Sequence, residues 1–115
     1  MSKGKVRIGI VGSGGMAGNN ARNLAHNNAA ELVAIASRNI ETGSNLAKKY
    51  NAHFMQNWHE MVQREDLDGI VVCTANDSHS EIIIESLEYN KHVFTEYPLA
   101  RSLEEGKIAV EAAIS

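Results

Sequence analysis

Short apolar runs alternate with amphipathic segments along almost the whole chain. Five runs have the length and composition of strands: residues 5–12, 31–38, 53–56, 68–75 and 91–98. Between the first two, apolar residues recur at helical spacing, namely Ala17, Ala21, Leu24 and Ala25. Such alternation predicts a mostly parallel sheet with helices on both faces, because the connection between parallel strands is long and right-handed. We therefore expect a single domain over residues 1–115, of the α/β class and the doubly wound Rossmann type.

Polar residues mark where the helices are expected to begin. Asn39 is a candidate N-cap for a helix over residues 40–50, whose apolar face would hold Leu46, Ala47 and Tyr50. Three further pairs have the spacing of a capping box: Asn57 with Glu60, Ser78 with Glu81, and Ser102 with Glu105. These pairs predict helices that begin directly after their first members.

Composition narrows the class of protein. The 115 residues are 43% hydrophobic with a formal net charge of −3, and their basic residues are scattered, so we expect neither nucleic acid nor a membrane as a partner. No apolar run has the length of a membrane span, and no signal-peptide pattern follows Met1. With Cys73 as the lone cysteine and no histidine at metal-ligand spacing, we expect a cytoplasmic protein without a metal site.

A glycine-rich stretch follows the first expected strand, with five glycines from Gly9 to Gly18. Gly12, Gly14 and Ala17 match the dinucleotide-binding pattern G-x-G-x-x-G/A in the context it requires, after a strand and at a helix start. Gly12 would allow a tight turn, Gly14 would let backbone N–H groups reach a pyrophosphate, and Ala17 would let helix and strand pack closely. The candidate cofactor-binding residues here are Gly12, Ser13, Gly14, Gly15, Met16 and Ala17. Alternatively, glycines one turn apart serve only close packing of the helix on the sheet.

The end of the second expected strand predicts which dinucleotide binds. A Rossmann fold that prefers NAD carries a carboxylate about 20 residues after the glycine loop, where it binds the adenosine ribose hydroxyls. Ser37 and Arg38 stand at that place. Because a guanidinium is a planar fork of donors suited to phosphate, the pair predicts NADP. NAD is the alternative, in which Arg38 is solvated or stacks on the adenine.

Three blocks of the sequence, RIGIVGSGGMA, LVAIASR and the segment from VVCTANDSH to GKIAVEAA, together resemble one known family. In the third block, Thr74, Ala75, Asn76 and His79 resemble a T-P-N-x-x-H motif with alanine for proline. The tripeptide at 96–98, Glu-Tyr-Pro, resembles an E-K-P motif with tyrosine for lysine. These motifs are similar to those of the nucleotide-binding half of the Gfo/Idh/MocA oxidoreductases, named for glucose–fructose oxidoreductase and inositol dehydrogenase.

The resemblance implies an oxidoreductase that moves a hydride between NADP(H) or NAD(H) and a small substrate, most often a sugar or polyol in relatives. Thr74 and Asn76 would lie along the ribose and nicotinamide, and Glu96 and Pro98 would shape the loop at the reacting end. Ala75 and His79 are further candidate cofactor-binding residues, with His79 orienting that loop or, alternatively, transferring protons. Tyr97 is the candidate catalytic residue, because a phenol hydroxyl can donate a hydrogen bond or proton to a developing anion; alternatively its ring packs beneath the cofactor.

Two departures from the family pattern leave other functions open. The Glu-Tyr-Pro sequence is similar to that of the biliverdin reductase branch, which reduces a linear tetrapyrrole. The chain also stops inside the apolar pattern of its last expected helix, without the family's C-terminal substrate domain, through which relatives usually form oligomers. We therefore expect a fragment that binds cofactor without turnover, or alternatively a non-enzymatic module that senses a dinucleotide.

Overall fold

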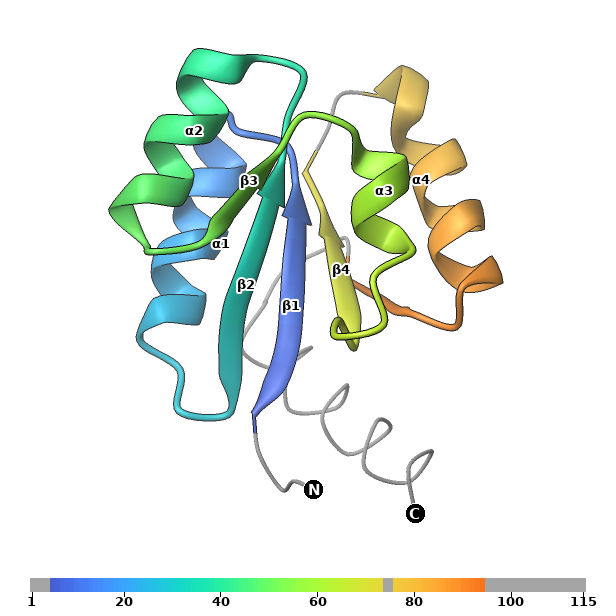
Figure 1. The fold of residues 1–115 in the computed structure, drawn as a ribbon, viewed down its shortest axis with the longest axis horizontal. Coiled ribbons are helices and arrows are strands. Elements are labelled where there is room, and N and C mark those ends of the chain that lie inside the picture. The colour runs from blue at the N-terminus through green and yellow to red at the C-terminus, as the bar shows by residue number, and fades with distance from the viewer. Residues whose placement is uncertain (1–4, 74–75, 95–115) are drawn as a thin grey trace.

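The computed structural model describes residues 5–73 and 76–94, with side chains for all of these except 76–79. Within that part of the chain, five parallel strands form one sheet in the order β3-β2-β1-β4-β5 (Figure 1). The strands are β1 Val6–Val11, β2 Ala30–Ala36, β3 His53–Met55, β4 Gly69–Val72 and β5 His92–Phe94. The expected α/β class with a Rossmann-type parallel sheet is confirmed.

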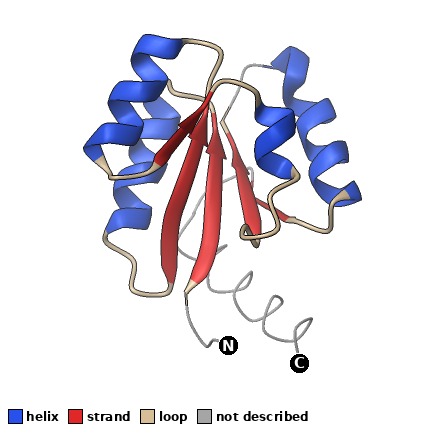
Figure 2. Cartoon of the chain, viewed as in Figure 1, coloured by secondary structure: helices blue, strands red, loops and turns tan. Residues whose placement is uncertain are grey.

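Helices cover both faces of the sheet (Figure 2). Helices α1, Gly15–Ala25, and α2, Ile40–Lys49, lie on one face, while α3, Trp58–Val62, and α4, Asn76–Glu88, lie on the other (Figure 1). No helix of the described residues is both long enough and apolar enough to cross a membrane.

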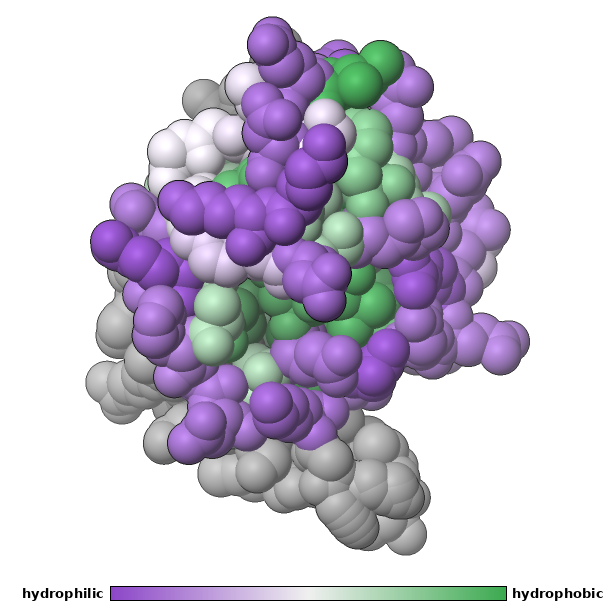
Figure 3. Space-filling view, turned by 60° about the vertical axis from the view of Figure 1, so that its left-hand side comes forward, coloured by the Kyte–Doolittle hydropathy of each residue, from purple (hydrophilic) through white to green (hydrophobic). Residues whose placement is uncertain are grey.

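The core has two apolar layers because side chains of a strand point alternately to its two faces. Ile8 and Ile10 of β1 pack into the layer beneath α1 and α2, whereas Val11 packs into the layer beneath α3 and α4. The three are at most 2% exposed, as continuous apolar strands covered on both faces should be. The face seen in Figure 3 is correspondingly hydrophilic over most of its area, with apolar atoms near its middle.

Two of the expected helix starts are confirmed and one is wrong. Asn39 Oδ1 accepts a hydrogen bond from the Thr42 N–H at 3.0 Å, and Asn57 Oδ1 accepts one from the His59 N–H at 2.9 Å, so both cap their helices. Helix α4 begins at Asn76, before the expected start at Ser78. Several residues at 76–80 favour helix starts, so the capping-box spacing did not single out the right one. Ser102 lies outside the described residues.

The buried face of α1 also differs from the predicted one. Ala17, Ala21 and Leu24 are buried as expected, but Ala25 is exposed and Asn20 is buried in its place. The i, i+3, i+4, i+7 positions thus face the sheet. Because Asn20 is polar, the spacing of apolar residues alone does not identify it as buried.

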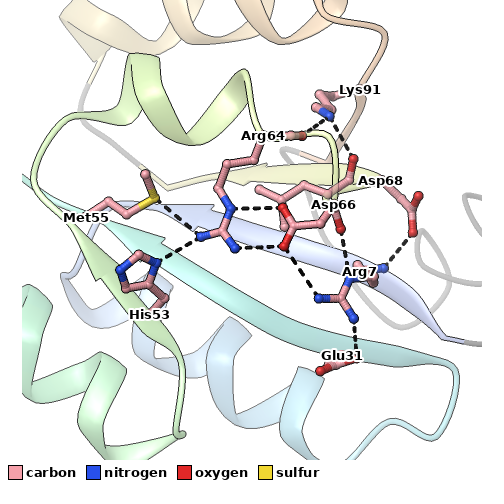
Figure 4. Close-up of polar contacts among 9 residues, drawn as sticks. Arg7, Glu31, His53, Met55, Arg64, Asp66, Asp68 and Lys91 are labelled. Carbon is pink, nitrogen blue, oxygen red and sulfur yellow. Dashed lines mark hydrogen bonds and ion pairs between the residues drawn. The ribbon is translucent and has the colours of Figure 1, made fainter.

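Charged side chains fasten the amino-terminal end of the sheet (Figure 4). Arg64 binds both carboxylate oxygens of Asp66 at 2.9 and 2.7 Å, and Arg7 lies 3.5 Å from Asp66 Oδ2 and 3.1 Å from Glu31 Oε1. The hydrogen bond from Arg64 is the main cause that lowers the pKa of Asp66. Lys91 Nζ donates to the backbone carbonyls of Arg64 and Leu67, and its burial lowers its pKa.

Candidate functional site

The carboxyl ends of the strands meet at one edge of the sheet, where the glycine-rich loop leaves β1 (Figure 1). Strand β1 pairs with β2 on one side and with β4 on the other. The chain therefore leaves β1 toward one edge of the sheet and later returns to build the other edge. This is the topological switch point, where open α/β sheets bind ligands.

Gly12 makes the turn that opens this site. Its φ is +123°, and a Cβ there would lie 2.8 Å from the Cys73 carbonyl oxygen. Its N–H donates to the Ala36 carbonyl at 2.8 Å, which ties the turn to the end of β2. Both the backbone conformation and the close approach to β4 require glycine, so the expected tight turn is confirmed.

The next glycines have no such role inside the chain. A Cβ on Gly14, Gly15 or Gly18 would meet no atom of the described residues within 4 Å, and none of the three has a positive φ. Within residues 5–73 and 76–94, packing of the helix on the sheet therefore does not require glycine at these three positions. Ala17 is the small residue that packs, being fully buried at the start of α1. The glycines instead keep the entrance of α1 bare of side chains.

In the described part of the chain, that entrance carries backbone donors without a side-chain cap. The N-cap of α1 is Gly14, which has no side chain to accept from the first-turn N–H groups, and no acidic residue lies in the first turn. Met16 is the nearby apolar side chain and is 49% exposed. Unpaired N–H groups and the helix dipole together favour an anion at such a helix start.

A cluster of hydroxyl groups joins the ends of β1 and β2. Ser13 Oγ lies 2.7 Å from Ser37 Oγ and 2.7 Å from Thr42 Oγ1. Ser37 is only 8% exposed and also accepts from the Asn39 N–H at 3.1 Å. Helix α2 can approach this closely because Gly43 has no side chain; a Cβ there would lie 2.7 Å from Ser37 Cβ. Ser13 and Ser37, predicted separately, are thus brought together.

Thr42 is a site residue that sequence reasoning missed. It follows the N-cap Asn39 by three residues, so it lies in the first turn of α2 and at the same edge of the sheet. That spacing was the available signal. Arg38 is exposed beside the cluster, and no described acid pairs with it, which leaves its guanidinium accessible at the site.

A second missed contact lies beneath the glycine loop. Asn20 Nδ2 donates to Cys73 Sγ at 3.1 Å, which links α1 to the residue that follows β4. Burial raises the pKa of the Cys73 thiol, which disfavours the reactive thiolate form. Asn20 Oδ1 is buried and has no hydrogen-bond partner in the described part of the chain.

The remaining predicted site residues stay predictions. Thr74, Ala75, Glu96 and Tyr97 lie outside the described residues, as does the proline that follows them. Asn76 is the first residue of α4, and the side chains of Asn76 and His79 are not among those described. Across residues 5–73 and 76–94, no three His, Cys, Asp or Glu side chains come together as a metal site would require.

Comparisons with known proteins agree with this geometry. A family model described as an oxidoreductase family with an NAD-binding Rossmann fold, Gfo/Idh/MocA, matches residues 6–115. Inositol 2-dehydrogenase of Rubrobacter xylanophilus is 28% identical over 111 residues, which are 96% of this chain and 32% of that protein. Glucose-6-phosphate 3-dehydrogenase of Bacillus subtilis is 33% identical over 107 residues, which are 93% of this chain and 30% of that protein.

A solved structure is similar over most of the chain. The crystal structure of Synechocystis biliverdin reductase in complex with biliverdin and NADP+ matches with a TM-score of 0.76 and 25% identity, covering 92% of this chain and 35% of that one. The present chain therefore spans about a third of the length of the proteins it resembles.

Proposed function

Because the chain belongs to the Gfo/Idh/MocA oxidoreductase family, with its NAD-binding Rossmann fold, we propose that it forms the dinucleotide-binding part of an enzyme that transfers a hydride between NADP(H) and a small substrate. The observation that carries this proposal is the bare entrance of α1. Among the described residues, nothing lies within 4 Å of a Cβ built on Gly14, Gly15 or Gly18, and neither backbone conformation nor packing against those residues requires glycine there. Close approach of an external group accounts for all three at once.

We place the pyrophosphate of the cofactor at this entrance. The first-turn N–H groups of α1 have no side-chain cap, and a bound pyrophosphate would give them charged acceptors. The turn at Gly12 holds the glycine loop against the end of β4, which fixes the position of the entrance of α1. The protein supplies binding and orientation, whereas the nicotinamide supplies or accepts the hydride.

We propose NADP rather than NAD as the preferred cofactor. Arg38 is exposed next to the hydroxyl groups of Ser37 and Thr42, and the chain has no carboxylate at the end of β2. A 2′-phosphate would find a guanidinium and neutral donors there, whereas a bare ribose would lack the acceptor that NAD-binding sites provide. The NADP+ bound by the similar biliverdin reductase supports this choice.

The proposed substrate is a sugar or polyol with a hydroxyl or carbonyl group. Two relatives, inositol 2-dehydrogenase and glucose-6-phosphate 3-dehydrogenase, carry such substrates in their names. Tetrapyrrole reduction is the second candidate, favoured by Tyr97 in its Glu-Tyr-Pro sequence and by the similarity to biliverdin reductase. In either case we propose that Tyr97 donates a hydrogen bond or proton to the oxygen or nitrogen anion that develops on the substrate.

The remaining parts of the proposal concern the whole protein. Since the chain spans about a third of its relatives, we propose that substrate binding and any homo-oligomer depend on a part of the protein beyond residues 1–115. Hydride transfer needs a substrate held over the nicotinamide, so we expect the 115-residue chain to bind cofactor without steady turnover.

The lone cysteine, Cys73, is consistent with the reducing cytoplasm as the proposed location.

Titration of the chain with NADPH and with NADH tests the central step. We expect saturable binding of both dinucleotides, with NADPH bound more tightly, and displacement of both by excess unlabelled dinucleotide. Adenosine alone, which lacks the pyrophosphate, serves as the control and should bind far more weakly. A folded chain that binds neither dinucleotide would overturn the proposed function.

A further inference from the structure

Asn20 occupies a place where an apolar residue is the ordinary choice. It lies on the buried face of α1 with Ala17, Ala21 and Leu24, and it is 5% exposed. Its Nδ2 donates to a thiol sulfur, a weak acceptor, and its Oδ1 has no partner in the described part of the chain. A buried, half-satisfied amide lowers stability relative to an apolar side chain of similar size. The contacts that Asn20 makes with the described residues therefore do not explain it as a stabilising residue.

The position of its partner suggests another role. Cys73 directly follows β4, and its N–H donates to the Val11 carbonyl at 2.8 Å. The Cys73 carbonyl also sits so close to Gly12 that a Cβ on that glycine would be 2.8 Å away. Asn20 reaches the same residue from the helix side. Gly12, Asn20 and Cys73 thus form one joint between the glycine loop, α1 and the end of β4.

This joint lies where the two halves of a dinucleotide would separate. In a doubly wound sheet a dinucleotide binds across the switch point, with one half beyond the end of β2 and the other beyond the end of β4. The adenosine side carries Ser37 and Arg38, whereas the chain after Cys73 leads to the other side. A shift of β4 against α1 would misplace the second half while leaving the first half bound.

We propose that Asn20 is a positioning residue, which through Cys73 fixes the end of β4 relative to the glycine loop so that both halves of the dinucleotide bind together. The inference rests on the proposed function. It predicts that Asn20 contributes to binding of the whole dinucleotide and contributes nothing to binding of its adenosine half.

Asn20→Leu separates positioning from stability. We expect the variant to unfold at the same or a higher temperature, to bind adenosine 2′,5′-bisphosphate within about twofold of wild type, and to bind NADPH about fivefold or more weakly. Leu24→Met, a volume-conserving change on the same buried face, is the control and should alter neither affinity. Because Asn20→Leu changes shape as well as polarity, Cys73→Ala is the second variant, and it should give the same pattern of ligand affinities.

The double variant decides whether the two residues act together. If the contact between Asn20 and Cys73 carries the effect, the loss of NADPH affinity in the double variant will be smaller than the product of the two single losses. Equal losses for NADPH and the bisphosphate, or unchanged NADPH affinity in a folded Cys73→Ala chain, would overturn the inference. A wild-type chain that binds neither ligand would instead overturn the proposed function, so the two failures are distinguishable.

Discussion

The two ends of the sheet use different kinds of side chain. At the amino-terminal end, Arg7, Arg64 and Lys91 find carboxylates or backbone carbonyls within the chain (Figure 4). At the carboxyl end, glycines, serines and a threonine surround a helix start that has no side-chain cap. The first arrangement satisfies its own polar groups, and the second leaves donors for a ligand. Ion pairs and hydrogen bonds hold the sheet together at one end, and we propose that the other end binds the ligand.

The largest expected effect is a difference in stability between two glycine substitutions at the carboxyl end of the sheet. Gly12→Ala places a Cβ 2.8 Å from the Cys73 carbonyl oxygen at a φ of +123°, so we expect it to lower the free energy of unfolding by about 3 kcal/mol or more. Gly18→Ala, in open space within α1, should raise it by about 0.5–1 kcal/mol. Urea denaturation of both variants measures the contrast, and similar midpoints would show that the turn is not strained.

Arg38 should show that the carboxyl end recognises a ligand rather than stabilising the fold. Losing its charge-assisted contact should weaken NADPH binding by about 1.5–3 kcal/mol, which is about tenfold to a hundredfold, while NADH binding changes little. The measurement is a pair of titrations on Arg38→Ala. Arg22→Ala, which removes an exposed positive charge from the last turn of α1, is the matched control. Equal losses for NADPH and NADH would assign Arg38 to adenine stacking instead.

In contrast to Arg38, Lys91 should contribute to stability and not to cofactor binding. Lys91→Met removes the Nζ donor from the carbonyls of Arg64 and Leu67, and among the described residues the Arg64 carbonyl keeps only the Leu67 N–H at 3.4 Å. We therefore expect a loss of about 1–3 kcal/mol in the free energy of unfolding and no change in NADPH affinity. Lys48→Met, on the exposed side of α2, controls for the loss of a positive charge. Weaker NADPH binding by folded Lys91→Met would mean that the two ends are coupled.

Replacing Asp66 should give the smallest effect, which is a change in how the free energy of unfolding depends on pH. Its pKa is lowered chiefly by the hydrogen bond from Arg64, so the folded state binds a proton less readily than the unfolded state. The stability that this carboxylate provides is present above its unfolded pKa near 3.8 and is lost as the pH falls through the lower folded value. We therefore expect the free energy of unfolding of Asp66→Asn to depend less on pH than that of wild type, and only in the acid range. Glu65→Gln is the control, and an identical change there would contradict the assignment.

Most of the fold could be predicted from the sequence because its signals are local. The alternation of apolar runs and helical patterns predicted the parallel sheet, and Asn39 and Asn57 predicted two helix starts. The errors lie where local signals are redundant or tertiary packing decides. Residues 76–80 offered several helix starts, and the buried face of α1 includes Asn20 rather than Ala25.

The candidate site was predicted less completely. Gly12 and Ala17 have the roles that the motif assigned to them, because a turn and a packed helix start are written in a few adjacent residues. Thr42 lies 29 residues from Ser13, and Asn20 lies 53 residues from Cys73, so their contacts exist only once the sheet is assembled. Local patterns carry no information on such pairs.

Gly14→Val tests most directly the claim that the carboxyl end binds a dinucleotide through the entrance of α1. Gly14 has φ −82° and ψ −163°, which valine adopts readily, and a Cβ there meets none of the described residues within 4 Å. We predict a folded variant whose NADPH affinity, measured by calorimetric titration, falls by about tenfold or more, while Asn23→Val on the exposed face of α1 keeps wild-type affinity. Unchanged NADPH affinity in folded Gly14→Val would contradict the account.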